Sequence, residues 1–407
     1  MEWKEVRLGD VCEIYGRIGF RGYTTNDLVD TPKEGAISLS PKNIINGELN
    51  LDQCTYIKWD KYYESPEIMI NPNEIIITKT GSSVGRTTFV RRVVHPMTLN
   101  PQLVVLKNIS ENAEFLSYYI KSALFQSVLK SIVVGSAIPT LSQKNLANLK
   151  INVPKEIDDQ RRIASILSSL DRKIELNNKI NADLEEMAQA IFKNWFVDFE
   201  PFKDGKFVDS ELGMIPEGWK VISLSEIMKY NGGSQPPASE FIDTYQEGYI
   251  RFIQIRDYDN DSHITYIPIS KRNKLCDELD IMIARYGAAL GRICWGLKGA
   301  YNVALAKVTP IKSYYREYLR CYLNTSYFYQ SINNKGARCA QSGFNQSDIN
   351  SYMIAFPIDE TVVMNFNDLC SSIMDKRLSL KYENSRLSLL RDTLLPRLMS
   401  GELEVPE

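Results

Sequence analysis

The sequence predicts a mixed α/β (α+β) fold in which two similar globular domains are each followed by a long α-helix, and the two helices pack together. Two observations predict this fold. One unit of about half the chain occurs twice, and each copy ends in a segment whose apolar residues recur at helical spacing. The 407 residues are also enough for two or three domains at ~150 residues each. A disordered, collagenous or purely coiled-coil chain does not fit this length and composition.

The duplication is clearest in two glycine loops. Residues 73–86 read Asn-Glu-Ile-Ile-Ile-Thr-Lys-Thr-Gly-Ser-Ser-Val-Gly-Arg, and residues 279–292 read Leu-Asp-Ile-Met-Ile-Ala-Arg-Tyr-Gly-Ala-Ala-Leu-Gly-Arg. A short apolar strand followed by two glycines predicts a hairpin or bend. Neither loop has the Gly-Lys-Ser/Thr ending of a phosphate-binding loop, or a third glycine followed by a helix. A nucleotide-binding loop is therefore excluded.

Further matches follow in the same order along both copies. Trp3 corresponds to Trp219 at the start, and Pro154 corresponds to Pro357 at the end of a strand-like run. We therefore expect one domain over residues 1–157 and a second over residues 218–360. A helix over 158–200, a linker containing Pro and Gly over 201–217, and a helix over 361–401 complete the predicted organisation.

The two helical segments carry a heptad seam of apolar and amide residues. A helix over about 158–196 would be roughly 58 Å long at ~1.5 Å per residue, too long to be buried by its own domain. The helices would then pack only on each other, or the pair would also receive helices from a partner chain. Asparagines in the seam would lower stability but fix the register. The candidate interface residues are Leu170, Ile174, Asn177, Asn181, Leu184, Ile373, Leu380, Asn384 and Leu387.

Charge is unevenly distributed along the chain, although the net charge is only -2. Residues 75–155 contain ten Lys and Arg against two Glu, a net of +8, and residues 281–347 contain nine against one, again +8. The remainder therefore carries -18. Two equivalent basic regions favour binding to the phosphates of DNA. The alternative is that these bases are simply dispersed over a solvated surface.

Basic and amide side chains near the glycine loops, and in the loops at 16–21 and 231–235, are the candidate DNA contacts. Arg, Asn and Gln can bond base edges two at a time, and glycine permits close approach of the backbone. Ordinary turns have the same composition. The candidates are Arg17, Arg21, Lys79, Arg86, Arg91, Arg92, Gln235, Arg285, Arg292 and Arg338.

Catalytic and metal-binding signatures are missing from the sequence. The seven cysteines never form a Cys-x-x-Cys pair, and there are only two histidines. No Asn/Asp-Pro-Pro-aromatic loop of an amino-methyltransferase occurs, and the basic segments are nearly devoid of the carboxylates that a nuclease needs. We expect no catalytic residue, no metal site and no cofactor in this chain. Without a signal peptide or an apolar run of ~20 residues, we also expect a cytoplasmic protein with no membrane partner.

Three segments are similar to the specificity subunit of type I restriction-modification systems. They read Leu-Glu-Glu-Met-Ala-Gln-Ala-Ile-Phe-Lys-Asn-Trp-Phe-Val-Asp-Phe at 184–199, Ser-Glu-Leu-Gly-Met-Ile-Pro-Glu-Gly-Trp at 210–219, and Leu-Leu-Pro-Arg-Leu-Met-Ser-Gly-Glu-Leu at 394–403. The resemblance implies a non-catalytic subunit with two target-recognition domains and two antiparallel helices. Each domain would read one half of a bipartite, asymmetric DNA sequence, and the helices would set the spacer length.

The resemblance also implies partners. Two methyltransferase subunits would dock on the helices, and restriction/translocase subunits would join them on double-stranded DNA. The complex would be an adenine-N6 DNA methyltransferase and ATP-dependent endonuclease, with S-adenosylmethionine, ATP and Mg²⁺ in the partner subunits. Two alternatives stay open: a coiled-coil scaffold that does not bind DNA, and a fragment of a self-contained restriction-methylation enzyme.

Overall fold

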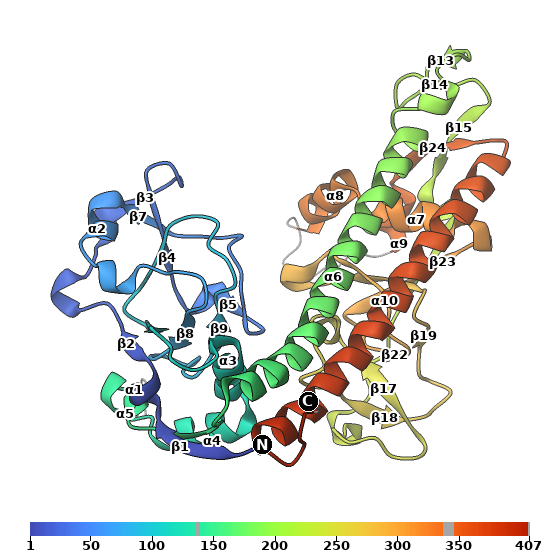
Figure 1. Ribbon diagram of the computed structural model, residues 1–407. Helices are drawn as coiled ribbons and strands as arrows, with labels where there is room; N and C mark the ends of the chain where they lie inside the picture. Colours follow the sequence, from blue (N-terminus) through green and yellow to red (C-terminus); the bar gives the residue numbers. More distant parts are fainter. Residues whose placement is uncertain (135–138, 337–345, 406–407) are drawn as a thin grey trace. The chain divides into compact units, whose positions relative to one another are not determined.

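The computed structural model describes residues 1–134, 139–336 and 346–405 (Figure 1). The chain divides into two compact units, the first formed by Met1–Ile174 with Arg386–Glu407 and the second by Glu175–Ser385. Each long helix therefore contributes to both units. The predicted duplication is confirmed, because the two units are built from corresponding elements in the same order.

In each unit, the globular domain opens and closes with the same antiparallel strand pair. In the first unit β1 (Trp3–Arg7) pairs with β12 (Lys150–Pro154), so that Trp3 lies opposite Pro154. In the second unit β15 (Trp219–Ser223) pairs with β24 (Met353–Pro357), with Trp219 opposite Pro357. The residues matched in the sequence therefore occupy the same register in both units. This ladder joins the start of each domain to the strand that leads into its long helix.

The first unit contains two four-stranded sheets, with strand orders β2-β11-β8-β9 and β10-β4-β7-β3. Leu103, Val104 and Val105 in β11 are all buried, so apolar side chains cover both faces of that strand. The remaining elements are β2 (Glu13–Tyr15), β3 (Leu28–Val29), β4 (Gly35–Leu39), β5 (Ile44–Ile45), β6 (Glu48–Leu49), β7 (Tyr56–Lys58), β8 (Ile75–Thr78), β9 (Thr87–Phe89), β10 (Met97–Leu99), β11 (Leu103–Lys107), α1 (Leu8–Val11), α2 (Trp59–Tyr63), α3 (Ala113–Lys121), α4 (Ala123–Ser131) and α5 (Gln143–Ala147).

The second unit repeats this plan with the sheet orders β16-β23-β20-β21 and β18-β17-β22-β19. The β17–β22 pair is parallel, as is the corresponding β10–β4 pair of the first unit. The two units differ at an edge, where β3 pairs with β7 but β19 pairs with β22. The elements are β16 (Met228–Gly232), β17 (Tyr249–Ile253), β18 (Tyr266–Pro268), β19 (Leu275–Cys276), β20 (Ile281–Ala284), β21 (Ile293–Cys294), β22 (Gly299–Tyr301), β23 (Leu305–Pro310), α7 (Arg316–Leu323), α8 (Ser326–Gly336) and α9 (Gln346–Asn350).

The two long helices are α6 (Ile157–Phe196) and α10 (Thr361–Met399). The Asp359 carboxylate accepts hydrogen bonds from the backbone and hydroxyl of Thr361, at 3.0 and 2.7 Å, and so caps the start of α10. Just beyond the last turn, Gly401 has φ +76°, as expected for the residue that ends a helix. The segment expected as a linker contains a short antiparallel pair, β13 (Phe207–Val208) and β14 (Ile215–Pro216).

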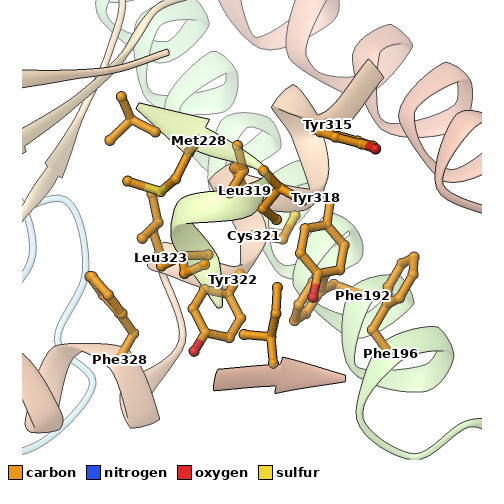
Figure 2. Packing of buried hydrophobic residues seen from close by; sticks show 14 of the residues in the cluster. Phe192, Phe196, Met228, Tyr315, Tyr318, Leu319, Cys321, Tyr322, Leu323 and Phe328 are labelled. Carbon is orange, nitrogen blue, oxygen red and sulfur yellow. The ribbon is translucent and has the colours of Figure 1, made fainter. Parts of the chain in front are cut away.

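An aromatic core joins the second domain to the long helices inside the second unit (Figure 2). Phe192 and Phe196 of α6 pack edge-to-face on Tyr318 of α7, at ring-centroid distances of 5.3 and 4.9 Å. Phe366 of α10 completes the cluster at 5.0 Å from Phe196. Edge-to-face pairs of buried rings stabilise such a core beyond the effect of area alone.

Candidate nucleic-acid interface

The glycine loop of the first unit is a tight turn between β8 and β9. The Thr78 amide donates to the Arg86 carbonyl at 2.8 Å, and the Gly85 amide donates to the Thr78 carbonyl at 2.9 Å. Gly85 has φ +90°, and a Cβ there would lie 2.8 Å from Gln126 and 3.0 Å from Leu129 of α4. Glycine is therefore required both by the backbone conformation and by the packing against α4.

The second glycine loop forms the same turn, with the two corresponding backbone hydrogen bonds. The Ala284 amide donates to the Arg292 carbonyl, and the Gly291 amide donates to the Ala284 carbonyl, both at 2.9 Å. Gly291 has φ +84°, and a Cβ there would lie 2.7 Å from Ile332 of α8. The two loops thus present different side chains on one backbone frame. The expectation of a structural turn agrees with this geometry.

In the first loop, Arg86 is exposed, whereas Lys79 is half-buried and its pKa is lowered by burial. Arg92, which follows β9, is also exposed. Within the part of the chain that the structure describes, neither Arg86 nor Arg92 forms an ion pair. Both guanidinium groups are therefore free to meet phosphate.

Other candidates of the first unit are engaged within the protein. Arg17 is 4% exposed, and its guanidinium donates to the Leu99 carbonyl at 2.8 Å and to the Thr98 hydroxyl at 3.1 Å. Arg21 pairs with Glu67 at 3.4 Å. Arg17 therefore holds the 16–21 loop against β10, and its side chain is not available to DNA in this structure.

Arg91 is drawn toward α3. Its guanidinium lies 3.3 Å from Glu114, and Arg172 of α6 lies 3.4 Å from the same carboxylate. These residues line a hollow of about 670 Å³ that also receives Arg161. Glu114 balances part of this positive charge: its pair with Arg172 fastens α6 to α3, and its pair with Arg91 holds the segment after β9 against α3.

Arg285 of the second glycine loop lies against Gly232 of the 231–235 loop, so the two candidate loops of the second unit are in contact. Its guanidinium lies 5.8 Å from the ring centroid of Tyr230 and 5.0 Å from that of Tyr286, and it donates to the Val303 carbonyl at 3.2 Å. A Cβ on Gly232 would lie 2.8 Å from this group. Gly232 therefore lets Arg285 approach the end of β16.

The remaining candidates of the second unit differ in their surroundings. Gln235 is exposed. Arg292 pairs with Asp259 at 2.7 Å, and this hydrogen bond raises the pKa of the guanidinium. Arg338 lies outside the described residues.

Ion pairs with acidic residues from other parts of the chain reduce the free positive charge of the two basic segments. Lys107, Lys150 and Lys155 pair with Glu74, Glu5 and Glu2, at 3.1, 2.6 and 2.6 Å, and all three carboxylates lie outside residues 75–155. The second unit shows the same compensation through pairs such as Lys307 with Asp280, at 2.5 Å. A count along the chain therefore overstates the charge available to phosphates.

Two exposed groups were not predicted from the sequence. The turn between β18 and β19 carries Lys271, Arg272 and Lys274, all exposed. In the first unit, Trp59 stacks on Tyr63, which is 64% exposed, with 6.2 Å between ring centroids. Both groups have a local sequence signal that could have identified them: three bases among the four residues 271–274, and three aromatic residues among the five residues 59–63.

The two helices pack antiparallel, as predicted. In the second unit, Asn177 donates to Asn384 at 2.9 Å, and Glu185 accepts from Arg377. A later residue of α6 thus contacts an earlier residue of α10, which shows that the helices run in opposite directions. Of the candidate interface residues, Asn177, Ile373 and Leu380 are buried. The half-buried ones are Leu170, Ile174, Asn181, Leu184, Asn384 and Leu387.

In the first unit the same helices meet through a charged pair. Asp171 of α6 lies 2.8 Å from Arg391 of α10 and accepts a hydrogen bond from the Tyr118 hydroxyl at 2.6 Å. Arg391 places a charge among the apolar residues of α10, and its pair with Asp171 shows how that charge is accommodated. Polar pairs therefore lie in the seam in both units.

Thiol and metal chemistry receive no support from the described residues. They contain no group of three or more His, Cys, Asp or Glu side chains placed to hold a metal ion. Burial raises the pKa of the Cys12 and Cys276 thiols to about 12. These thiols therefore stay protonated near neutral pH and are poor nucleophiles. Over the same residues, no helix has both the length and the apolar character needed to span a bilayer.

Comparison with known proteins agrees with this architecture. Residues 1–186 and 216–377 match the type I restriction modification DNA specificity domain. The MjaIX specificity subunit of Methanocaldococcus jannaschii is 27% identical over 100% of this chain and 94% of its own length. The HindI specificity subunit of Haemophilus influenzae is 24% identical over 99% of this chain and 100% of its own.

A solved structure shares the fold. The type I restriction-modification S subunit from M. genitalium aligns with a TM-score of 0.61 and 16% identity, over 98% of this chain and 96% of its own. Because the DNA specificity domain matches both halves of the chain, the protein belongs to the family of type I restriction-modification specificity subunits.

Proposed function

We propose that this chain directs a type I restriction-modification complex to one bipartite, asymmetric DNA sequence. Residues 1–157 and 218–360 act as two target-recognition domains, each reading one half-site. The observation that carries this proposal is the repeated loop frame, in which Gly85 and Gly291 make the same turn while the neighbouring exposed side chains differ. One frame with different side chains suits the reading of two different half-sites.

Phosphate contacts would come from the exposed bases of each domain. Arg86 and Arg92 serve the first domain, and the Lys271–Lys274 turn serves the second. Such contacts position a protein on the duplex but carry no sequence information. Base reading then belongs to neighbouring exposed side chains such as Gln235, whose amide can bond adenine with two hydrogen bonds.

The long helices would set the spacer and receive the methyltransferase subunits. Along α6, Leu176 and Met187 are 51% and 54% exposed, and along α10, Leu389 is 69% exposed. Large apolar side chains on the outer faces of long helices suit the docking of partner helices. Adenine-N6 methylation and ATP-dependent cleavage would then be carried out by partner subunits, which would also hold S-adenosylmethionine, ATP and Mg²⁺.

A domain exchange tests the assignment of the two half-sites. Replacing residues 218–360 with the corresponding domain of another specificity subunit should change one half-site and leave the other half-site and the spacer unchanged. The strand ladder from Trp219 to Pro357 closes this domain, so both junctions fall next to paired backbone. The measurement is a map of methylated adenines on DNA exposed to the assembled methyltransferase.

The reciprocal exchange of residues 1–157 is the control, and it should change only the other half-site. If either chimaera assembles, methylates DNA and keeps the original bipartite sequence, the domain assignment is wrong.

A further inference from the structure

Trp295 is held by two cations of α10 within the second unit. It lies in the turn between β21 and β22, with the Arg377 guanidinium 4.6 Å and the Lys381 ammonium 5.6 Å from its ring centroid. Lys381 also donates to the Trp295 carbonyl at 3.4 Å. Cations over an indole face attract it most strongly when they are shielded from water. We call Trp295, Arg377 and Lys381 the Trp295 clamp.

The cations of the clamp are fixed by their surroundings. Arg377 is 8% exposed and donates to Glu185 of α6, so its position depends on both long helices. Burial lowers the pKa of both Arg377 and Lys381. Gly296, at φ +86°, lacks the Cβ that would lie 2.6 Å from the Lys381 ammonium. The turn thus leaves room for the lysine to reach the domain.

The clamp is a second attachment of the recognition domain to α10. The first is the aromatic core, where Phe366 of α10 packs with Phe196. Phe196 in turn contacts Tyr318 of the domain (Figure 2). This core reaches along α10 from Val363 to Ile373. Arg377 and Lys381 lie 4 and 8 positions beyond Ile373, or about 6 and 12 Å at the rise of an α-helix. The clamp thus extends the contact between the domain and α10 beyond the end of this core, where a further contact restricts the tilt of the domain most effectively.

The first unit uses a different attachment. There α6 meets α3 through Asp171 with Tyr118 and through Arg172 with Glu114, at 2.6 and 3.4 Å. Gln160, about three turns earlier on α6, also accepts a hydrogen bond from the Asn112 amide at 2.8 Å. This unit is therefore attached at separated points without a tryptophan clamp. The clamp therefore concerns the domain at residues 218–360.

We propose that the Trp295 clamp fixes the orientation of the second recognition domain relative to α10, and so makes the complex select one spacer length. This inference rests on the proposed function. The clamp residues touch neither reacting atoms nor, in this assignment, bases. Their loss would let the second domain reach half-sites displaced by one base pair without changing the bases that it reads.

The test uses the complete complex with its methyltransferase subunits and three duplexes: the cognate site, and the same half-sites with the spacer one base pair shorter or longer. For Trp295→Ala, we expect methylation of the altered spacers relative to the cognate one to rise about three- to tenfold, the range that loss of a cation–π contact allows. Single-base changes within either half-site should be rejected as strongly as by the wild type.

Matched variants separate positioning from general damage. Trp295→Phe retains an aromatic face, so this variant should keep the wild-type spacer preference. Lys376→Ala removes an exposed base beside Arg377 and should have no effect. If Trp295→Ala does not assemble, Lys381→Met keeps the aliphatic chain and removes only the ammonium, and it should relax the spacer preference to a smaller extent.

The outcomes decide between the two proposals. An unchanged spacer preference in Trp295→Ala, or in Lys381→Met where the first variant does not assemble, overturns the clamp inference alone. Equal loss of spacer and base discrimination also overturns it, because a merely structural role would give that result. A wild-type complex that methylates no bipartite sequence overturns the proposed function, and this inference with it.

Discussion

At the scale of single residues, the environment of each base decides its role more than its type does. Arg17 and Arg86 occupy similar basic, glycine-rich sequence contexts, yet Arg17 is buried against backbone carbonyls and Arg86 is exposed. Burial of an arginine is tolerated where its donors find acceptors, as the donors of Arg17 find Leu99 and Thr98. The sequence could nominate both residues but could not separate them, because Leu99 and Thr98, which bury the Arg17 side chain, are more than 80 positions away from it.

Gly85→Ala should destabilise the first domain. The substitution places a Cβ at φ +90° and 2.8 Å from Gln126, so both backbone strain and crowding oppose it. We expect a loss of about 1–3 kcal/mol in the free energy of unfolding, measured by urea denaturation. Gly19→Ala is the control, because a Cβ there meets open space. Equal stability of the two variants would contradict the requirement for glycine in the loop.

At the scale of elements, the heptad pattern was sufficient to predict both long helices and their seam. It could do so because an apolar stripe of helical period has to be buried whatever the partner is. The pattern did not reveal the partners of its polar positions. Asn177 meets Asn384, and Asp171 meets Arg391, across more than 200 positions of sequence. Only the folded helices bring these side chains together.

Glu360, at the start of α10, should make the free energy of unfolding fall as the pH is lowered through the acid range. Its carboxylate accepts hydrogen bonds from Lys312, at 2.6 and 2.8 Å, and from Tyr314, and these lower its pKa from 4.5 to about 2. Because the folded state has the lower pKa, this contribution is present above pH 4.5 and is lost as the pH falls toward 2. The group is partly exposed, so Glu360→Gln should cost about 0.5–1 kcal/mol at pH 7.

The measurement for Glu360→Gln is urea denaturation from pH 7 down to pH 2, where the difference from the wild type should vanish. Glu247→Gln, which alters an exposed carboxylate of the same unit, is the control and should change stability by less than about 0.5 kcal/mol. A constant difference across the whole pH range would show that the ionised carboxylate is not the cause.

At the scale of the whole molecule, a near-neutral chain can still bind a polyanion if free bases remain after internal pairing. Ion pairs such as Lys107 with Glu74 use up part of each basic segment. Exposed bases remain in both units, among them Arg86, Arg92 and the Lys271–Lys274 turn. We therefore expect salt-dependent DNA binding with fewer phosphate contacts than the count along the sequence implies.

Duplex binding by the assembled complex should weaken steeply between 50 and 200 mM salt, in a plot of log K against log salt with a slope of about -0.9 per phosphate contact. Arg86→Gln and Arg92→Gln should each reduce the slope by about 1, measured by fluorescence anisotropy. Arg91→Gln is the control: it is paired with Glu114 and should change the slope less. A flat salt response would contradict DNA binding and favour the coiled-coil scaffold.

The sequence by itself determined the duplication, the glycine turns, the long helices and the family resemblance, because these depend on local periodicity and on motifs that occur twice. Tertiary structure decided which bases remain exposed, which charges cancel, and where Trp295 meets Arg377 and Lys381. These properties depend on contacts between residues far apart in the chain, and local pattern does not encode them. The duplicated frame is therefore readable from the sequence, whereas the surface offered to DNA is a property of the fold.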